Sequence, residues 1–182
     1  MTRKDDLIAH VFRLVGVARS AHLKQTLTEI NPEPGLNFWR FIYGNLLDVA
    51  VLEWCKIFGT HAEPTHWKKL ITDHDSFRNG LLAALKINEP TWVAYWEEMK
   101  NYRDNRIAHH IEYADLKNYP KLDLALESSY YYYAHLIKEL REVGEMKYPD
   151  DLREYSTKFA AQAVVIAKAA LGATDWIPEK VY

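Results

Sequence analysis

Apolar residues recur every three or four positions along most of the chain, and proline and glycine interrupt this pattern at only a few places. Residues three and four apart share one face of an α-helix, so the spacing predicts a succession of amphipathic helices. No segment shows the alternation of apolar and polar residues that is typical of a half-buried strand. The pattern therefore predicts an all-α fold.

The breaks in the pattern set the expected helix boundaries. Two prolines within residues 31–35 end the first helix, because proline cannot continue the helical hydrogen bonding, and single glycines end later helices. Long helices are expected over about 5–30, 36–58, 90–113, 120–143 and 150–171, and shorter ones over about 65–71 and 73–87. This arrangement implies an up-and-down helical bundle with extra short helices, and 182 residues suit a single domain, 1–182.

The composition limits the classes of function. The formal net charge of −2 argues against a broad nucleic-acid-coating surface and leaves room for a small basic cleft. The single cysteine, Cys55, excludes an intrachain disulfide and a cysteine-based zinc cluster, and it fits a reducing compartment. No apolar run has the length of a membrane span, and the N-terminal residues do not resemble a signal peptide. We therefore expect a cytoplasmic protein with no membrane partner.

Three groups of side chains are assigned to structure rather than to chemistry. The packing face expected for the helix over 90–113 consists of Trp92, Tyr95, Trp96, Met99 and Tyr102. Cys55 lies in a helix that is apolar nearly all round and is interpreted as core packing. His61, His66 and His74 lack the spacing of metal ligands and are interpreted as solvated loop histidines.

One polar stretch, residues 102–110, stands out near the end of the helix expected over 90–113. Its eight residues from 103 to 110 include two arginines, a carboxylate, an amide and two histidines. An α-helix turns about 100° per residue, so Arg103, Arg106 and His110 would share one face, while His109 would lie roughly 120° from Arg103. Such a mixture makes the stretch the leading candidate for a functional site.

The spacing resembles the signature of the HEPN superfamily (higher eukaryotes and prokaryotes nucleotide-binding), which is an arginine, a polar residue and a histidine four to six positions after the arginine. Arg103, Asp104 and His109 occupy these three positions. The flanking residues are similar to the abortive-infection branch, in which Arg-Asp-x-x-Ile-Ala-His closes a helix, and residues 52–59 and 66–69 also resemble that branch. The resemblance covers about residues 35–115 and becomes more specific when these features are combined.

The resemblance implies a metal-independent endoribonuclease of the toxin or phage-defence type, with no cofactor and no metal. It also implies that two motif helices meet across a homodimer to form the RNA cleft. His109 would be the general acid or base and Arg103 the phosphate clamp. Asp104 would orient one of these side chains or hold Arg103 in place, and Arg106 and His110 would contact the RNA backbone. The chemistry suits these roles, because a histidine titrates near neutral pH and a guanidinium matches two phosphate oxygens.

Several alternatives stay open at this stage. The single-face geometry favours His110 over His109 as the acid or base. Arg103 could instead pair with Asp104 or Glu98, and Arg106 with Asp104 or Glu112, as ordinary helix ion pairs. The second function considered is a non-catalytic HEPN-like helical dimer that binds a nucleotide, RNA or a protein partner. The sequence does not identify an RNA target, a trigger or an antitoxin partner.

Overall fold

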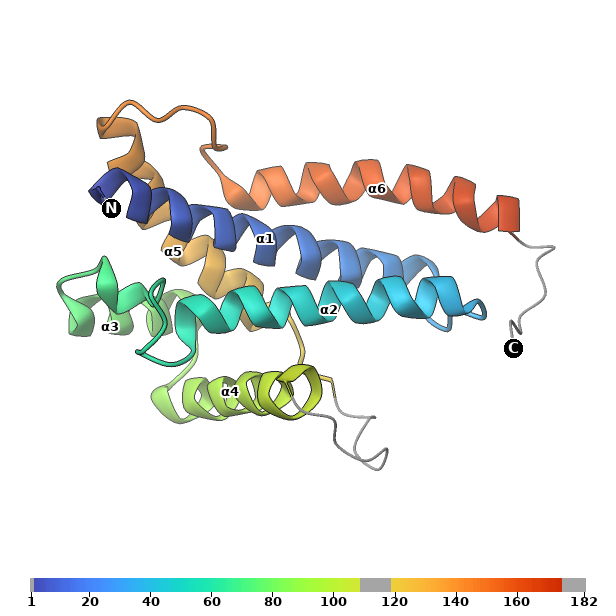
Figure 1. Cartoon of the computed structure of the whole chain (residues 1–182), viewed down its shortest axis with the longest axis horizontal. Coiled ribbons are helices and arrows are strands. Elements are labelled where there is room, and N and C mark those ends of the chain that lie inside the picture. The colour runs from blue at the N-terminus through green and yellow to red at the C-terminus, as the bar shows by residue number, and fades with distance from the viewer. Residues whose placement is uncertain (1, 109–118, 175–182) are drawn as a thin grey trace.

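A computed structural model describes residues 2–108 and 119–174, and these residues are almost entirely helical (Figure 1). In these two ranges the chain forms six α-helices and two short helical turns, with no strand. The helices are α1 (Arg3–Ile30), α2 (Asn37–Phe58), α3 (His74–Leu85), α4 (Glu89–Tyr102), α5 (Asp123–Glu142) and α6 (Leu152–Thr174), and the turns are η1 (Trp67–Lys69) and η2 (Arg103–Ala108). The prediction of an all-α helical bundle is confirmed.

Helices α1 and α2 run antiparallel and pack along their length (Figure 1). The Tyr43 hydroxyl of α2 donates to the Leu27 carbonyl near the end of α1 at 2.6 Å. Toward the opposite ends of the two helices, Arg13 of α1 donates to Glu53 of α2 at 2.7 Å. A buried tyrosine must satisfy its hydroxyl, so the first bond fixes the turn between the helices as well as their direction.

Helices α5 and α6 both pack on α1, in opposite directions. Arg3 at the start of α1 pairs with Glu139 near the end of α5, while Gln25 lies 3.2 Å from Asp123 at the start of α5. On the other side of α1, the Arg19 guanidinium contacts the Tyr155 ring of α6. Ala167, further along α6, shares a small apolar cluster with residues near the end of α1. The long helices α1, α2, α4, α5 and α6 thus alternate in direction.

The connection from α2 to α4 contains the least regular structure. A short helix was expected over about 65–71, and the chain forms only the single turn η1 there. Asp73 caps α3 by accepting from the Ser76 amide at 2.9 Å. The interpretation of His66 as a solvated histidine is wrong, because its side chain is buried and its Nδ1 accepts from the Lys68 amide. His66 packs against the Trp67 ring, which is why it leaves the solvent.

The main core is aromatic and centres on Trp54 of α2. This side chain is fully buried, its indole N–H donates to Ser128 of α5 at 2.9 Å, and its ring packs against Trp92 of α4. Cys55 is also buried, as predicted, and its thiol lies 3.7 Å from the Met99 carbonyl oxygen. These contacts hold α4 against α2 and α5 and thereby set the position of the segment that follows α4.

Candidate functional site

Helix α4 begins where its sequence predicts and leads directly to the candidate site. Asn88 caps it by accepting from the Thr91 amide at 2.9 Å, and Pro90 lies in the first turn, where its missing N–H costs nothing. The predicted packing face is confirmed, with Trp96 half-buried and the other four members buried: Trp92, Tyr95, Met99 and Tyr102. The aromatic stripe of α4 therefore serves packing.

The α-helix predicted through the motif is wrong from Arg103 onward. Residues Arg103–Ala108 form the π-helical turn η2, in which hydrogen bonds join residues five apart. A π turn takes more residues than an α turn, so the 100° spacing that placed Arg103 and Arg106 on one face does not apply. The predicted continuation to residue 113 falls outside the described residues.

Arg103 is held by its neighbour Asp104. Its Nε donates to Asp104 Oδ1 at 2.7 Å, and the two side chains are 17% and 47% exposed. This hydrogen bond raises the pKa of Arg103 above its ordinary value, with burial acting in the opposite direction. One of the ion pairs considered from the sequence is therefore present, and it leaves the Arg103 guanidinium permanently charged but partly neutralised.

Arg106 has a different environment, because its guanidinium lies over tyrosine rings. It is 5.5 Å from the Tyr102 ring centroid and 4.7 Å from that of Tyr119. Its Nη2 also lies 3.4 Å from the Tyr119 hydroxyl oxygen. Within residues 2–108 and 119–174 no carboxylate comes within ion-pairing distance of Arg106, so the alternative in which Arg106 pairs with Asp104 is absent, while Glu112 falls outside that range.

Asp48 and Tyr119 belong to this site, and the sequence analysis did not predict either of them. The buried Tyr102 donates its hydroxyl to Asp48 of α2 at 2.7 Å, and burial, followed by this hydrogen bond, raises the pKa of Tyr102. The proton therefore stays on the Tyr102 hydroxyl, and the Asp48 carboxylate accepts the hydrogen bond. Tyr119 lies beyond the motif in sequence, and no local pattern distinguishes it. Asp48 and Tyr119 become recognisable only when the chain folds.

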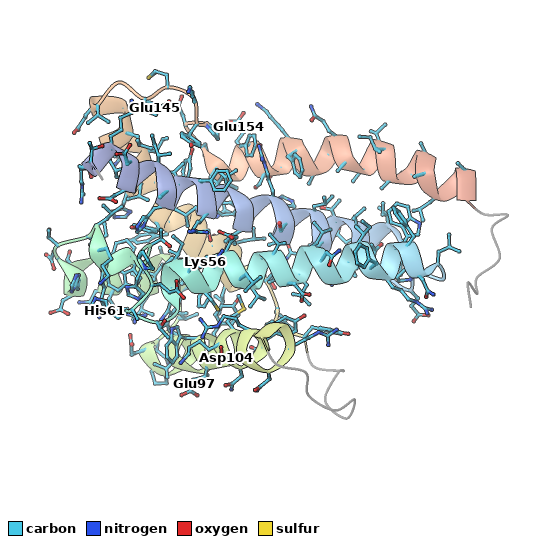
Figure 2. All side chains as sticks on the ribbon, viewed as in Figure 1. Lys56, His61, Glu97, Asp104, Glu145 and Glu154 are labelled. Atoms are coloured by element: carbon cyan, nitrogen blue, oxygen red, sulfur yellow. The ribbon has the colours of Figure 1, made fainter. Side chains whose placement is uncertain are left out.

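The site lies at the edge of the bundle farthest from α6. Figure 2 labels Asp104 at the end of α4, below α2, with α6 on the opposite side of the molecule. Lys100 adds a third cation here, with its Nζ 4.1 Å from the Trp96 ring centroid. His109 and His110, the proposed acid or base and its alternative, lie outside the described residues, and their roles stay predictions.

Two further properties of the described residues bear on function. Among residues 2–108 and 119–174, no three histidine, cysteine, aspartate or glutamate side chains converge as ligands of a metal ion would. No helix in the described part of the chain is both long and apolar enough to cross a bilayer. Comparison with family models, characterised proteins and solved structures gave no match to this chain.

Proposed function

We propose that the protein is a metal-independent endoribonuclease of the HEPN toxin or abortive-infection type. The observation that carries the proposal is the coincidence of the motif with the π turn Arg103–Ala108. π-Helical turns are rare and occur frequently at functional sites, because the extra residue redirects side chains that a regular helix would keep in register. Here the π turn includes Arg103 of the motif and the nearby Arg106.

The chemistry needs few protein groups, because RNA carries its own nucleophile in the 2′-hydroxyl. In the proposed reaction the 2′-oxygen attacks the adjacent phosphorus, its proton passes to a base, and the bond to the 5′-oxygen breaks as that oxygen takes up a proton. His109 would transfer these protons, since its ordinary pKa lies near neutrality. Arg103 and Arg106 would stabilise the negative charge that builds on the phosphoryl oxygens.

The arrangement of the two arginines supports a division of labour between them. Asp104 fixes Arg103 at 2.7 Å, which suits a clamp that must be oriented before substrate binds. Arg106 is held by the Tyr102 and Tyr119 rings, which do not neutralise its guanidinium, so its positive charge can interact with a phosphate. In the proposal two copies pair through these turns, which doubles the positive charge at the cleft of an otherwise slightly acidic, cytoplasmic protein.

A second function is favoured by one observation, the burial of the clamp. Arg103 is only 17% exposed and is already paired with a carboxylate. Such a residue fits a non-catalytic HEPN-like helical dimer, in which the ion pair stabilises η2 and the surface around it binds a nucleotide, RNA or an antitoxin-like protein partner. The two functions differ in whether the bound RNA is cut.

Cleavage of single-stranded RNA in EDTA tests the proposal. Wild-type protein is expected to produce fragments that end in a 2′,3′-cyclic phosphate, and His109→Ala is expected to abolish them. His110→Ala tests the alternative acid or base: cleavage that persists in His110→Ala and is lost in His109→Ala assigns the proton transfers to His109. Equal cleavage by wild type and His109→Ala would reject the assignment. RNA binding without cleavage, across RNAs of varied sequence, would establish the second function instead.

A further inference from the structure

The two tyrosines that hold Arg106 differ in how they are fixed. Tyr102 is buried and anchored to Asp48, whereas Tyr119 is 48% exposed. Their ring centroids are 6.4 Å apart and the ring planes are tilted by 57°. The Arg106 guanidinium contacts both rings, of which Tyr102 is anchored and Tyr119 is exposed.

The exposed Tyr119 ring is not needed for the electrostatic attraction between Arg106 and a phosphate. Phosphate binding alone requires only the guanidinium, and an exposed tyrosine beside it adds a flat apolar surface. Nucleobases of single strands stack on such rings and on arginine planes, and the adjacent phosphate accepts from the arginine N–H groups. In a duplex the base faces are covered by their neighbours and are not accessible to the ring.

We propose that Tyr119 and Arg106 form a binding site for one unpaired base of single-stranded RNA together with its phosphate. The inference rests on the proposed function and narrows its substrate to unpaired RNA. The base stacks on the exposed side of Tyr119, and Arg106 donates to a non-bridging phosphate oxygen. Tyr102 and Asp48 act as positioning residues, since they fix the ring beneath the cation without reaching the ligand.

A purely structural role for the same contact makes a different prediction. Arg106 and Tyr119 are 13 residues apart, and their contact joins the two ends of the intervening chain. If it served only to close that segment, removing the ring would lower stability and leave RNA binding unchanged in the folded protein. Thermal unfolding and RNA affinity must therefore be measured on the same variants.

Fluorescence anisotropy with labelled oligouridylate and oligoadenylate separates the two roles. Measurements use the full-length protein carrying His109→Ala, in EDTA, so that the RNA stays intact and binding does not depend on cleavage. Adding Tyr119→Leu is expected to weaken single-strand affinity about tenfold, whereas Tyr119→Phe, which keeps the ring, stays within about twofold. Arg106→Lys keeps the charge but loses the plane, and it is expected to weaken binding about threefold.

The α1–α6 face offers a matched control for the variants. Arg19 lies 5.2 Å from the Tyr155 ring centroid there, which reproduces the arginine–tyrosine contact away from α4. Tyr155→Leu is expected to leave RNA affinity unchanged. Duplex RNA of the same sequence is expected to bind more weakly than the single strand and to be insensitive to Tyr119→Leu.

Four outcomes would overturn the inference. They are wild-type affinity in a folded Tyr119→Leu variant, duplex binding as tight as single-strand binding, an effect of Tyr155→Leu equal to that of Tyr119→Leu, and displacement of the oligonucleotide by uridine monophosphate at equal concentration. The last would assign the site to a free nucleotide. If the wild-type protein does not cleave RNA but binding still depends on Tyr119, only the nuclease proposal is rejected. The two proposals therefore fail separately.

Discussion

Mild acid is expected to destabilise the folded protein through two buried histidines. His10 of α1 is 2% exposed, and its Nδ1 lies 2.9 Å from the Tyr132 hydroxyl oxygen. Burial, with smaller contributions from Arg13 and Arg3, lowers the pKa of His10 from 6.5 to about 4. The ring is therefore neutral at pH 7, and acid must add a proton to a buried group that already lies near two arginines.

His66 presents the same situation at η1. It is 4% exposed, and its Nδ1 accepts from the Lys68 amide at 3.2 Å, which requires that nitrogen to be unprotonated. Burial, followed by the neighbouring His61 and the nearby lysines, lowers the pKa of His66 from 6.5 to about 4. Protonation would place a charge on a buried ring and would remove the hydrogen bond by which His66 caps η1.

The sign and size of the effect follow from these two shifts. A histidine with a depressed folded-state pKa contributes its full stability above its unfolded value of 6.5 and loses that contribution as the pH falls toward about 4. At pH 5 each histidine stabilises the fold by about 2 kcal/mol less than at pH 7, or about 4 kcal/mol for the pair. Domains of this kind are stable by about 5–15 kcal/mol, so the loss is a large fraction of the total.

Urea unfolding at pH 7 and pH 5 measures this loss directly. Asparagine is the matched replacement at both sites, because its amide oxygen can take the place of Nδ1 as an acceptor without titrating. His10→Asn and His66→Asn are each expected to remove about half of the loss that this pair contributes, and the double variant all of it, leaving the share of other groups such as His22, whose pKa burial also lowers. His135→Asn, at an exposed position, is expected to keep the wild-type pH dependence. A double variant that still loses about 4 kcal/mol would refute the reasoning.

Three other substitutions or reactions test the packing that positions the site. Tyr102→Phe removes the donor to Asp48 and is expected to lower the free energy of unfolding by about 1–3 kcal/mol in urea titrations, while an unchanged value would mean that the bond adds nothing. Trp54→Phe leaves Ser128 without its indole donor beside a small void and is expected to cost about 2–4 kcal/mol, and a loss below about 1 kcal/mol would contradict its central role. Burial raises the pKa of the Cys55 thiol to about 12, so iodoacetamide should modify it only in denaturant; rapid alkylation of native protein, followed by mass spectrometry, would contradict that burial.

The sequence predicts those parts of the fold that depend on local chemistry. Asn88 and Pro90 mark the start of α4 because capping and proline geometry are properties of neighbouring residues. Gly59 ends α2 as predicted, but with a negative φ and in a position where a Cβ would overlap the Cys55 carbonyl oxygen. His66 was misassigned because its burial depends on how η1 packs, and a loop-like sequence around it carries no sign of that. Helix periodicity reports which face is apolar, but it does not report what covers an irregular segment.

The candidate site shows the same division more sharply. The identity of Arg103, Asp104 and Arg106 as a polar group could be predicted, and the pairing of Arg103 with Asp104 was one of the alternatives considered, although adjacent side chains do not face each other on a regular α-helix. The π turn could not, since a π and an α turn of the same residues have nearly the same local preferences. Asp48 comes from α2 and Tyr119 from the segment before α5, and only tertiary packing brings them to this site.

These partners decide which of the two arginines is better placed to receive a phosphate. At Arg103 a carboxylate 2.7 Å away already supplies the countercharge, so an incoming phosphate must share the guanidinium with Asp104 and overcome repulsion from it. At Arg106 the attraction comes from ring faces, which hold the cation without neutralising it and are worth less than an ion pair with phosphate. In the proposed nuclease a phosphate that reaches η2 would therefore gain more at Arg106, the arginine expected to contact the RNA backbone, and would bind there first. Arg103 would act after binding, as an oriented group for which the phosphate competes with Asp104.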